Sequence, residues 1–488
     1  MTEENGKLKR FTTAQLLNFC FGFFGLQFAW QMEIILCGPV VEKLGASPFL
    51  LGLIWLAGPV TGMVVQPFIG ALSDRTNTRF GKRKPFLFFG ALFASIALVL
   101  FPLSGNIVNH INSTFSIQLP ELSGLFFAAI MVWVIDACVN AAQGQYRALI
   151  PDNMPVEQHS LANSYLSFAI GIGSVIAAGT APFLEHFCGY QMSHTAQFVM
   201  AAIAFFGATL WTCLTITEVK KVAEKSKKES AEEIIEEVKE EEKTFIQNFK
   251  EFFTCSPEVP KICTVQFFTW IAIMAVNIYF TQFIVHKVMA IPEIDAGDIQ
   301  TKIAYISQLL GNPDVTAAMA KAEFESRMLS ATNFAALCFA AYNLVCFIVS
   351  LPIGYLSSKF GNKPVHIVSL MIMSLAYAGI AFSTDQTHII IFMALAGIGW
   401  ASTLALPFAM LTRFIGSGSE GSVMGIFNIF IAAPQIIVCT LVAWFINHSK
   451  VACEFGVNYH FEYALMVGAV VLMCAALSAF TIKEKVIE

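Results

Sequence analysis

The chain has 488 residues, of which 56% are hydrophobic and only 13% are charged. Soluble domains carry about 25% charged residues, so this composition excludes an ordinary soluble protein and indicates one that lies in a membrane. The net charge is only −5, and the basic residues do not follow a groove-binding face, which argues against a nucleic-acid partner.

Twelve apolar stretches of about 20 residues follow one another along the chain, and this length crosses about 30 Å of hydrocarbon. We expect membrane-spanning helices over residues 12–38, 49–72, 85–104, 121–148, 158–185, 195–217, 260–289, 328–357, 364–383, 387–412, 421–447 and 459–482. The first stretch follows Lys7, Lys9 and Arg10. It is too long for a signal peptide and lacks a small-residue cleavage site, so we count it as a span.

Basic residues in the short loops predict the orientation of the chain. The loop after the second span, Ser73–Lys84, holds five of them, whereas the loops after the third, fifth and ninth spans hold no Lys or Arg. Both termini are therefore expected on the cytoplasmic side. The long connection over 218–258 is dense in Lys and Glu, which favours a solvated cytoplasmic linker.

The two halves of the chain share a motif where the second span of each half ends. QPFIGALSD (Gln66–Asp74) precedes RFGKRKP (Arg79–Pro85), and the pattern recurs as SLPIGYLSS (Ser350–Ser358) before KFGNKP (Lys359–Pro364). Two six-span halves with matching loops are typical of an internally repeated transporter. We expect an all-α membrane protein with a six-helix bundle over 1–217, a linker over 218–258 and a second bundle over 259–488.

The fourth span carries a polar stripe formed by Asp136, Asn140, Gln143 and Arg147. Their spacing places the four side chains within about 40° of one line along a helix. A carboxylate at bilayer depth costs roughly 2.5–3.5 kcal/mol on insertion scales, so the stripe must face protein or a water-filled cavity.

The members of this stripe are assigned different roles. Asp136 is a candidate proton site, because removal from water favours the neutral carboxyl group. Asn140 and Gln143 are candidate substrate contacts. Arg147 lies about 16 Å further along the helix, near its cytoplasmic end, and is a candidate gating charge. The alternative for Asp136 is a structural hydrogen bond to Ser or Asn of a neighbouring helix.

Other spans contribute amides, hydroxyls and aromatic faces of the kind that bind a neutral sugar. The candidate contacts are Gln27, Trp30 and Gln31 in the first span, Gln66 in the second, Asn140 and Gln143 in the fourth, Asn277, Tyr279, Thr281 and Gln282 in the seventh, and Asn428 and Gln435 in the eleventh. Each amide could instead bond a neighbouring helix, and Trp30 could simply pack. Glu33 is a second candidate acid for the proton, although its direction off the Gln27–Gln31 face favours an interfacial side chain or a structural hydrogen bond.

Several stretches resemble known families of carriers. GALSDR followed by RFGKRK is similar to the loop signature of the major facilitator superfamily. The resemblance implies that an Asp and basic residues of this loop latch the cytoplasmic gate; here these are Asp74, Arg75, Arg79, Lys82, Arg83 and Lys84. Ile54–Phe86, Trp133–Leu149 and Pro407–Gln435 resemble sucrose transporters and related glycoside–pentoside–hexuronide:cation symporters.

The resemblance to sucrose carriers is specific in two spans and fails in a third. The fourth-span Asp, Asn and Arg recur as Asp136, Asn140 and Arg147, and the eleventh span matches at Gly425, Asn428, Pro434 and Gln435. Plant members carry acidic and basic residues in and just after the seventh span. Here WIAIMAVNIYFTQFIVHK (Trp270–Lys287) offers no acidic residue, so coupling would depend on the first half.

The resemblance implies a major facilitator fold that imports a disaccharide or related glycoside, such as sucrose or maltose, together with a proton. The expected partners are the sugar, the proton and membrane lipid, and we expect a monomer in the inner or plasma membrane with no cofactor and no metal. The alternative is a sodium-coupled or exporting carrier of another small polar solute. A membrane enzyme is disfavoured because the chain lacks HExxH and GxSxG motifs. A sensor or receptor is disfavoured because the linker is too short for an independent signalling domain.

The outer loops leave three further expectations. Residues 291–327 are long for an outer loop and are expected to contain an interfacial helix. Glu185 and His286 lie near span ends, where we expect contact with water and with the interface respectively. Cys188 and Cys453 fall in predicted outer loops and could pair, whereas most other cysteines are expected to be small buried hydrophobic residues.

Overall fold

Twelve helical segments among the described residues are long and apolar enough to cross a membrane, which confirms the number expected from the sequence. The structure is a computed structural model, and it describes residues 3–4, 7–8, 10–76, 78–218, 250, 252–254, 256–295, 297–411, 414 and 420–483. The third span continues to Phe115 and the eighth begins at Ala317, so both are longer than expected and exceed about 30 Å of hydrocarbon.

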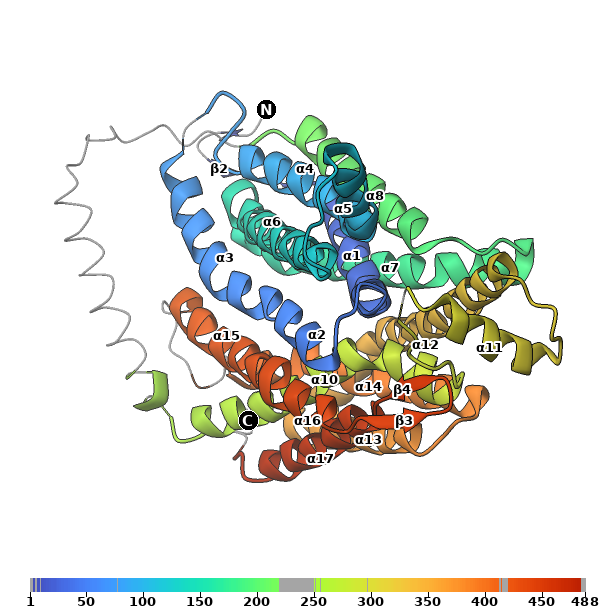
Figure 1. Cartoon of the computed structure of the whole chain (residues 1–488). Coiled ribbons are helices and arrows are strands. Elements are labelled where there is room, and N and C mark those ends of the chain that lie inside the picture. The colour runs from blue at the N-terminus through green and yellow to red at the C-terminus, as the bar shows by residue number, and fades with distance from the viewer. Residues whose placement is uncertain are drawn as a thin grey trace.

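The first half of the molecule holds spans one to six (Figure 1). They are formed by α1 (Thr13–Glu42), α2 (Pro48–Trp55) with α3 (Ala57–Arg75), α4 (Lys84–Leu100) with α5 (Ser104–Phe115), α6 (Ser123–Asn153), α7 (Val156–Cys188) and α8 (His194–Thr215). α1 packs on α7 and α8, α4 packs on α6 and α8, and α3 lies along α6. A short hairpin of β1 (Glu3–Glu4) and β2 (Lys7–Leu8) precedes α1.

The second half holds spans seven to twelve. They are formed by α10 (Val259–Gln282) with a π-helical continuation η2 (Phe283–Val288), α12 (Ala317–Phe360), α13 (Asn362–Ala381), α14 (Gln386–Leu411), α15 (Glu420–Ile437), which continues through the π-helical η4 (Val438–Val442) into α16 (Ala443–Asn447), and α17 (Glu462–Ala479). α10 packs on α17 and α15, α13 packs on α14 and α17, and α12 packs on α14.

Several helices begin where the sequence supplies a capping side chain. The Thr12 hydroxyl accepts the Gln15 backbone N–H, and the Gln15 side chain accepts the Thr12 backbone N–H, which forms a capping box at the start of α1. Ser47 caps α2 just before Pro48, whose missing N–H is harmless at the first helical position. These local signals fix where α1 and α2 begin.

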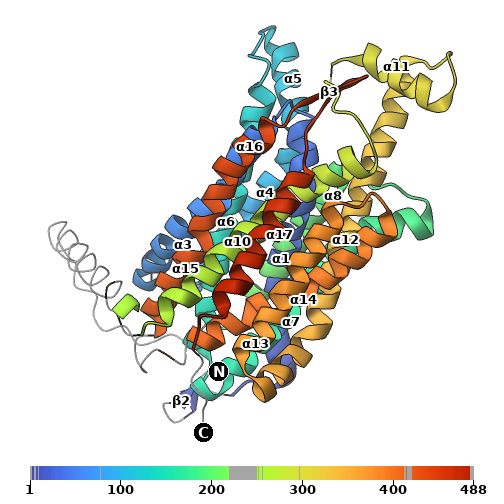
Figure 2. The same ribbon diagram turned by 90° about the horizontal axis from the view of Figure 1, so that it is seen from below.

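The bundle has a terminal end and a distal end. At the terminal end lie β2, the start of α1 and the last described residue, Lys483, and at the opposite, distal end α1 finishes at Glu42 and α12 begins (Figure 2). α11 (Ile299–Leu310) and the hairpin of β3 (Val451–Cys453) and β4 (Gly456–Asn458) lie at the distal end.

The segment over 291–327 forms a small cap on the distal end. It contains α11, as the sequence predicted a helix there, and then the first turns of α12. Tyr305, Ile306, Val315 and Ala320 make a separate buried apolar cluster in this cap. Glu293 pairs with Val457 of β4 through two backbone hydrogen bonds, so the cap and the hairpin are joined.

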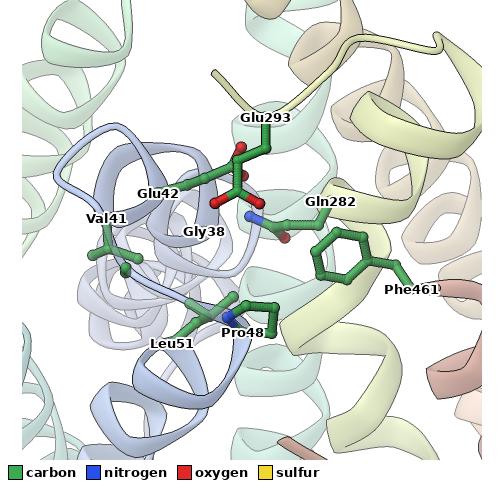
Figure 3. Close-up of a pocket in the computed structure, with 9 residues that line it drawn as sticks. Gly38, Val41, Glu42, Pro48, Leu51, Gln282, Glu293 and Phe461 are labelled. Atoms are coloured by element: carbon green, nitrogen blue, oxygen red, sulfur yellow. The ribbon is translucent and has the colours of Figure 1, made fainter. Parts of the chain in front are cut away.

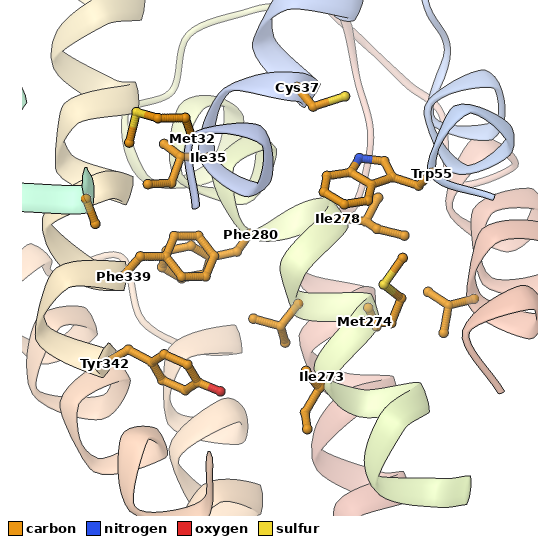
Figure 4. Close-up of a cluster of buried hydrophobic side chains, with 14 of the residues drawn as sticks. Met32, Ile35, Cys37, Trp55, Ile273, Met274, Ile278, Phe280, Phe339 and Tyr342 are labelled. Atoms are coloured by element: carbon orange, nitrogen blue, oxygen red, sulfur yellow. The ribbon is translucent and has the colours of Figure 1, made fainter. Parts of the chain in front are cut away.

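Polar contacts between the halves lie at the distal end, and an apolar contact lies deeper in the bundle. At the distal end the Tyr279 hydroxyl donates to the Pro48 carbonyl at 3.0 Å, and the Lys43 ammonium pairs with Glu325. Deeper in the bundle, an apolar cluster joins α1, α10 and α12, with Met32, Phe280 and Phe339 among its members (Figure 4). The halves are therefore packed together from the distal end inward.

Candidate functional site

Asp136 of α6 and Glu33 of α1 form a pair of buried carboxyl groups near the middle of the bundle. Their exposed fractions are 2% and 1%, and the two groups are close enough to interact electrostatically. The Trp30 indole lies within hydrogen-bond reach of Asp136. Among the described residues, Asp136 Oδ2 and Glu33 Oε1 have no hydrogen-bond partner. Such a pair has the chemistry to hold a proton or a small cation.

The position of Glu33 differs from the interfacial one that its direction favoured. α1 packs on helices of both halves, α7, α8, α10 and α12 among them, so a side chain on either side of α1 meets protein. The carboxyl group therefore extends toward Asp136 rather than toward the membrane surface. A helical projection of α1 alone cannot show this, because it does not say how many faces have neighbours.

Asp136 also lies at the junction between the two halves. Cys37 of α1 and Cys439 of the second half are both close enough to interact electrostatically with the Asp136 carboxyl group. On the third side, a Cβ added to Gly58 of α3 would be 3.7 Å from Asp136 Oδ2. Since residues of both halves surround this carboxyl group, movement of one half against the other would change its environment.

Three amides and a hydroxyl form a network between α3 and α6. Gln66 Nε2 donates to Asn140 Oδ1 at 2.8 Å and to Gln143 Oε1 at 3.2 Å, and Asn140 Nδ2 donates to Thr61 Oγ1 at 3.0 Å. Gln66, Asn140 and Gln143 were predicted together as substrate contacts, and the structure does bring them together. In this conformation they bond one another, so a ligand would have to exchange these bonds for its own.

The remaining first-span candidates lie near the same level. Gln31 is 3% exposed, and its Oε1 accepts a hydrogen bond from Asn343 Nδ2 of α12 at 3.1 Å. Its own Nε2 has no partner among the described residues. Gln27 is half-buried beside Gly173 of α7. Asn343 was missed by the sequence reasoning, although an amide within the apolar eighth span was a signal of the same kind.

The candidates in the second half are distributed more widely. Tyr279 is fully buried with its hydroxyl on Pro48, and Thr281 and Gln282 are buried without partners among the described residues. Asn277 is half-buried and Asn428 is exposed. Gln435, half-buried on the eleventh span, donates to the Ile431 carbonyl of its own helix. Tyr279 and Gln282 therefore lie at the distal contact between the halves, away from the amide network.

Arg83 organises the predicted gating loop from within the first half. Its guanidinium group pairs with Asp74 through Nη2 at 2.5 Å and with Asp152 through Nε at 2.9 Å, and Nη1 donates to Gln145 at 3.1 Å. Lys82 also pairs with Asp152, at 3.0 Å. Asp152 and Gln145 were missed because nothing in the sequence links the end of α6 to this loop.

Glu218 completes this loop from the end of the first half. Its carboxylate accepts the backbone N–H groups of Lys82, Arg83 and Lys84 at the start of α4, where a negative charge favours the helix dipole. The Lys84 ammonium donates to the Ile216 carbonyl. These contacts attach the first residue of the predicted linker to the first bundle. Linker residues 219–249 lie outside the described residues.

Of the other predicted gating charges, Arg75 and Arg79 lie at the surface of the terminal end and Arg147 lies within the span α6. The Arg79 guanidinium stacks on Phe80 at 4.7 Å, and Arg75 closes the last turn of α3. Arg147 is exposed on α6 and makes none of the hydrogen bonds or ion pairs found among the described residues. Its exposure on the helix that carries Asp136 agrees with a position near the terminal mouth of the bundle.

Two acidic side chains at the distal end, Glu185 and Glu42, contact the second half of the molecule, and the sequence did not predict either contact. Glu185 of α7, expected in water, accepts hydrogen bonds from Ser330 at 2.5 Å and Asn333 at 2.6 Å of α12, and from Gln191 at 2.8 Å. His286, expected at the interface, is 4% exposed and pairs with Glu42. Cys188 and Cys453 are both exposed and free, so the possible disulfide is absent. No cluster of metal-binding side chains occurs in the described part of the chain.

Comparisons with known proteins agree with this architecture. A model of the Major Facilitator Superfamily matches residues 17–311 and 303–487. The chain is 24% identical over 492 residues to the general alpha-glucoside permease of Schizosaccharomyces pombe, with 86% of this chain and 84% of that protein covered. It is 24% identical over 444 residues to the sucrose transport protein SUT5 of Oryza sativa subsp. indica, with 85% and 78% covered.

Solved structures show the same fold at low sequence identity. The D-xylose-proton symporter superposes with a TM-score of 0.61 at 13% identity, covering 96% of this chain and 98% of that one. The inward open conformation of the xylose transporter XylE from E. coli superposes with a TM-score of 0.56 at 14% identity, covering 96% of each chain. The predicted arrangement of twelve spans in a major facilitator fold is thereby confirmed.

Proposed function

The chain belongs to the major facilitator superfamily, and from this premise we propose that it carries a sugar across the membrane together with a proton. Membership in this family of transporters also confirms the expectation of a carrier rather than an enzyme. The substrate class that we propose is a disaccharide or related glucoside. Its support is that the relatives matched over most of this chain are named as an alpha-glucoside permease and a sucrose transport protein.

The observation that carries the proton coupling is the buried pair of Glu33 and Asp136. Both carboxyl groups keep an oxygen without a partner among the described residues, and both lie where the halves meet. A charged pair in this position would be costly, so one proton shared by the pair is the simplest ligand. The seventh span has no acidic residue, which leaves this pair as the coupling site that we propose.

The sugar would bind beside this pair. Trp30 offers an aromatic face next to Asp136, and Gln66, Asn140 and Gln143 offer donors and acceptors one to two turns away. Sugar hydroxyls can replace the bonds that these amides now make to each other. Asn277 and Asn428, half-buried and exposed in the second half, are the groups we propose to complete the site when the halves rearrange.

The conformation fits one stage of alternating access. We place both termini and the linker over 218–258 in the cytoplasm, which puts the packed distal end outside. The bundles over 1–217 and 259–488 would then be closed toward the outside and ready to release ligands inward. The solved structures with the same fold include inward-open and inward-facing ones. Protonation from outside and sugar binding would precede this stage, and rocking of the bundles would lead to it. We propose that a single chain is the functional unit.

Transport in reconstituted vesicles tests the proposal. Asp136→Asn should retain sugar exchange between equal pH values but lose accumulation driven by a pH gradient, because an amide cannot take up the proton. Glu33→Gln should weaken the same step. Asp385→Asn is the matched control, since Asp385 is exposed in a distal loop and its helix cap is one that Asn also provides.

The same vesicles separate the proton from a sodium ion. Two carboxyl groups with free oxygens also suit Na⁺, so uptake is measured with a proton gradient and, separately, with a sodium gradient. Accumulation that follows only the pH gradient supports the proposal. Accumulation that follows added Na⁺, or a pH-driven uptake that survives Asp136→Asn, contradicts it.

A further inference from the structure

A second group of titratable side chains lies at the distal end, separate from Asp136. His286 of η2 is stacked against Phe461 and is almost fully buried, and its Nε2 is 2.8 Å from Glu42 Oε1 of α1. His286 belongs to the second half and Glu42 to the first. This contact therefore exists only while the distal ends of the halves are together.

The neighbours of the two His286 ring nitrogens show where this contact can hold a proton. Its Nδ1 lies 2.7 Å from the Ile291 carbonyl, which can only accept, so Nδ1 must carry a hydrogen. The other nitrogen faces the Glu42 carboxylate. A proton on Nε2 makes His286 a cation that attracts the Glu42 carboxylate 2.8 Å away, and this ion pair contains one proton more than a neutral His286 beside the same carboxylate.

Glu293 and Gln282 adjoin this contact. Figure 3 shows the carboxylates of Glu42 and Glu293 beside each other, with the Gln282 amide directed toward them, in a pocket that Gly38 and Phe461 also line. Gln282 is 2% exposed, and neither its nitrogen nor its oxygen has a partner among the described residues. Burial and the nearby Glu42 carboxylate raise the pKa of Glu293 to about 7. Closing the distal end thus brings the carboxylates of Glu42 and Glu293 together, and a bound proton reduces the electrostatic repulsion between them.

We propose that Glu42, His286 and Glu293 form a proton-operated latch that holds the distal end closed. When the halves separate, Glu42 leaves with α1 and the three groups meet water, where ordinary carboxyl groups are ionised at neutral pH. The closed form therefore binds roughly one proton more than the open form near pH 7. Its population is highest at low pH and falls as the pH rises. The latch rests on the proposed function only for the statement that this end faces outside.

Other titratable groups around the latch have identified partners or keep one charge state. Tyr459 is near both carboxylates, and burial raises its pKa to about 12, so it is neutral throughout this pH range. Lys450 and Asp295 act on Glu293 with opposite signs. The remaining charges are engaged in pairs of their own: Lys287 and His460 with Glu462, and Lys43 with Glu325.

The experiment measures the opening of the distal end as a function of pH, without requiring transport. Spin labels are placed on native Cys188 at the end of α7 and on Thr387→Cys in the first turn of α14, one on each half and both exposed. The other accessible cysteines are replaced by serine. Distances between the labels in the full chain in lipid nanodiscs give the ratio of closed to open molecules between pH 5.5 and 8.5.

The expected results differ in sign between two variants. In the wild-type chain the closed-to-open ratio should fall up to tenfold per pH unit around neutrality. Glu293→Gln imitates the protonated carboxyl group and should be more closed than the wild-type chain at high pH. His286→Asn keeps a donor for Ile291 but cannot hold the extra proton, so it should be more open than the wild-type chain at pH 5.5, with a weaker pH dependence that comes from Glu293 beside Glu42.

Two outcomes would overturn the latch: a wild-type ratio that does not change with pH, or a Glu293→Gln variant that opens as His286→Asn does. The second would mean that these residues only fill space. Asp136→Asn is the variant that separates the latch from the proposed transport function. It should leave the pH dependence of the distances in place, so a failure of sugar or proton transport and a failure of the latch are observed separately.

Discussion

Substitution of Gly52 by alanine should open the distal end. Gly52 of α2 faces the second half, and an added Cβ would lie 2.4 Å from Ala443 Cβ and 2.6 Å from the Cys439 carbonyl oxygen. Neither atom is the end of a flexible side chain, so α2 and the η4–α16 segment would have to separate. Extra methyl groups in packed interiors cost about 1–3 kcal/mol. The open form does not carry this cost, so the closed-to-open ratio should fall about 5- to 150-fold.

Accessibility of a buried thiol from outside measures this change. Cys439 is fully buried against Gly52, so a membrane-impermeant thiol reagent should label it faster in Gly52→Ala than in the wild-type chain. Gly70→Ala is the matched control, because no atom lies within 4 Å of a Cβ added at that position of α3. Equal labelling rates in Gly52→Ala and in the control would refute the reasoning that backbone contact at Gly52 closes the distal end.

Three further substitutions test other contacts. Arg83→Ala leaves Asp152 with Lys82 but without its guanidinium partner and should lower the thermal unfolding temperature by an amount that corresponds to about 1–3 kcal/mol, whereas an unchanged midpoint would contradict a structural role. Glu185→Gln replaces an acceptor of three hydrogen bonds and should increase labelling of Cys439, as Gly52→Ala does. Burial opposes ionisation of Glu258, but hydrogen bonds, first that from the Lys483 backbone N–H, lower its pKa overall. Its contribution to stability is therefore present above about pH 4.3 and lost as the pH falls through the lowered pKa, so Glu258→Gln should remove part of the acid sensitivity of unfolding between pH 3 and 6.

The spans were predictable because each one satisfies its own backbone and displays its apolar length directly in the sequence. The same holds for the stripe on α6, whose polar side chains share one face regardless of neighbours. Gln66 was one of the candidate contacts, as were Asn140 and Gln143, and the three meet in the structure because polar side chains in apolar helices pair with one another. The boundaries at Phe115 and Ala317 were missed because these helices continue beyond the hydrocarbon, where hydropathy gives no signal.

Contacts between distant segments were not predictable from one sequence. Glu185 has an ordinary position at a span end, and only the approach of α12 gives it Ser330 and Asn333 as donors. Glu218 reads as the start of an acidic linker, although it binds the backbone at the start of α4. In both cases the function of the side chain depends on a partner more than 100 residues away in the chain.

The two proton sites that we propose are joined by one continuous helix. Glu33 and Glu42 lie on α1, nine residues or about 13.5 Å apart, and each is completed by a group from elsewhere: Asp136 of α6 for Glu33, and His286 of the second half for Glu42. Asp136 and Glu33 both move with the first half, so that pair can keep its proton whichever end is open. The contact of Glu42 with His286 breaks whenever the distal end opens. A proton on the inner pair can therefore be carried, whereas a proton on the distal contact reports and stabilises closure. Loss of coupling in Asp136→Asn and weaker pH-dependent closure in His286→Asn should accordingly be separable in one protein.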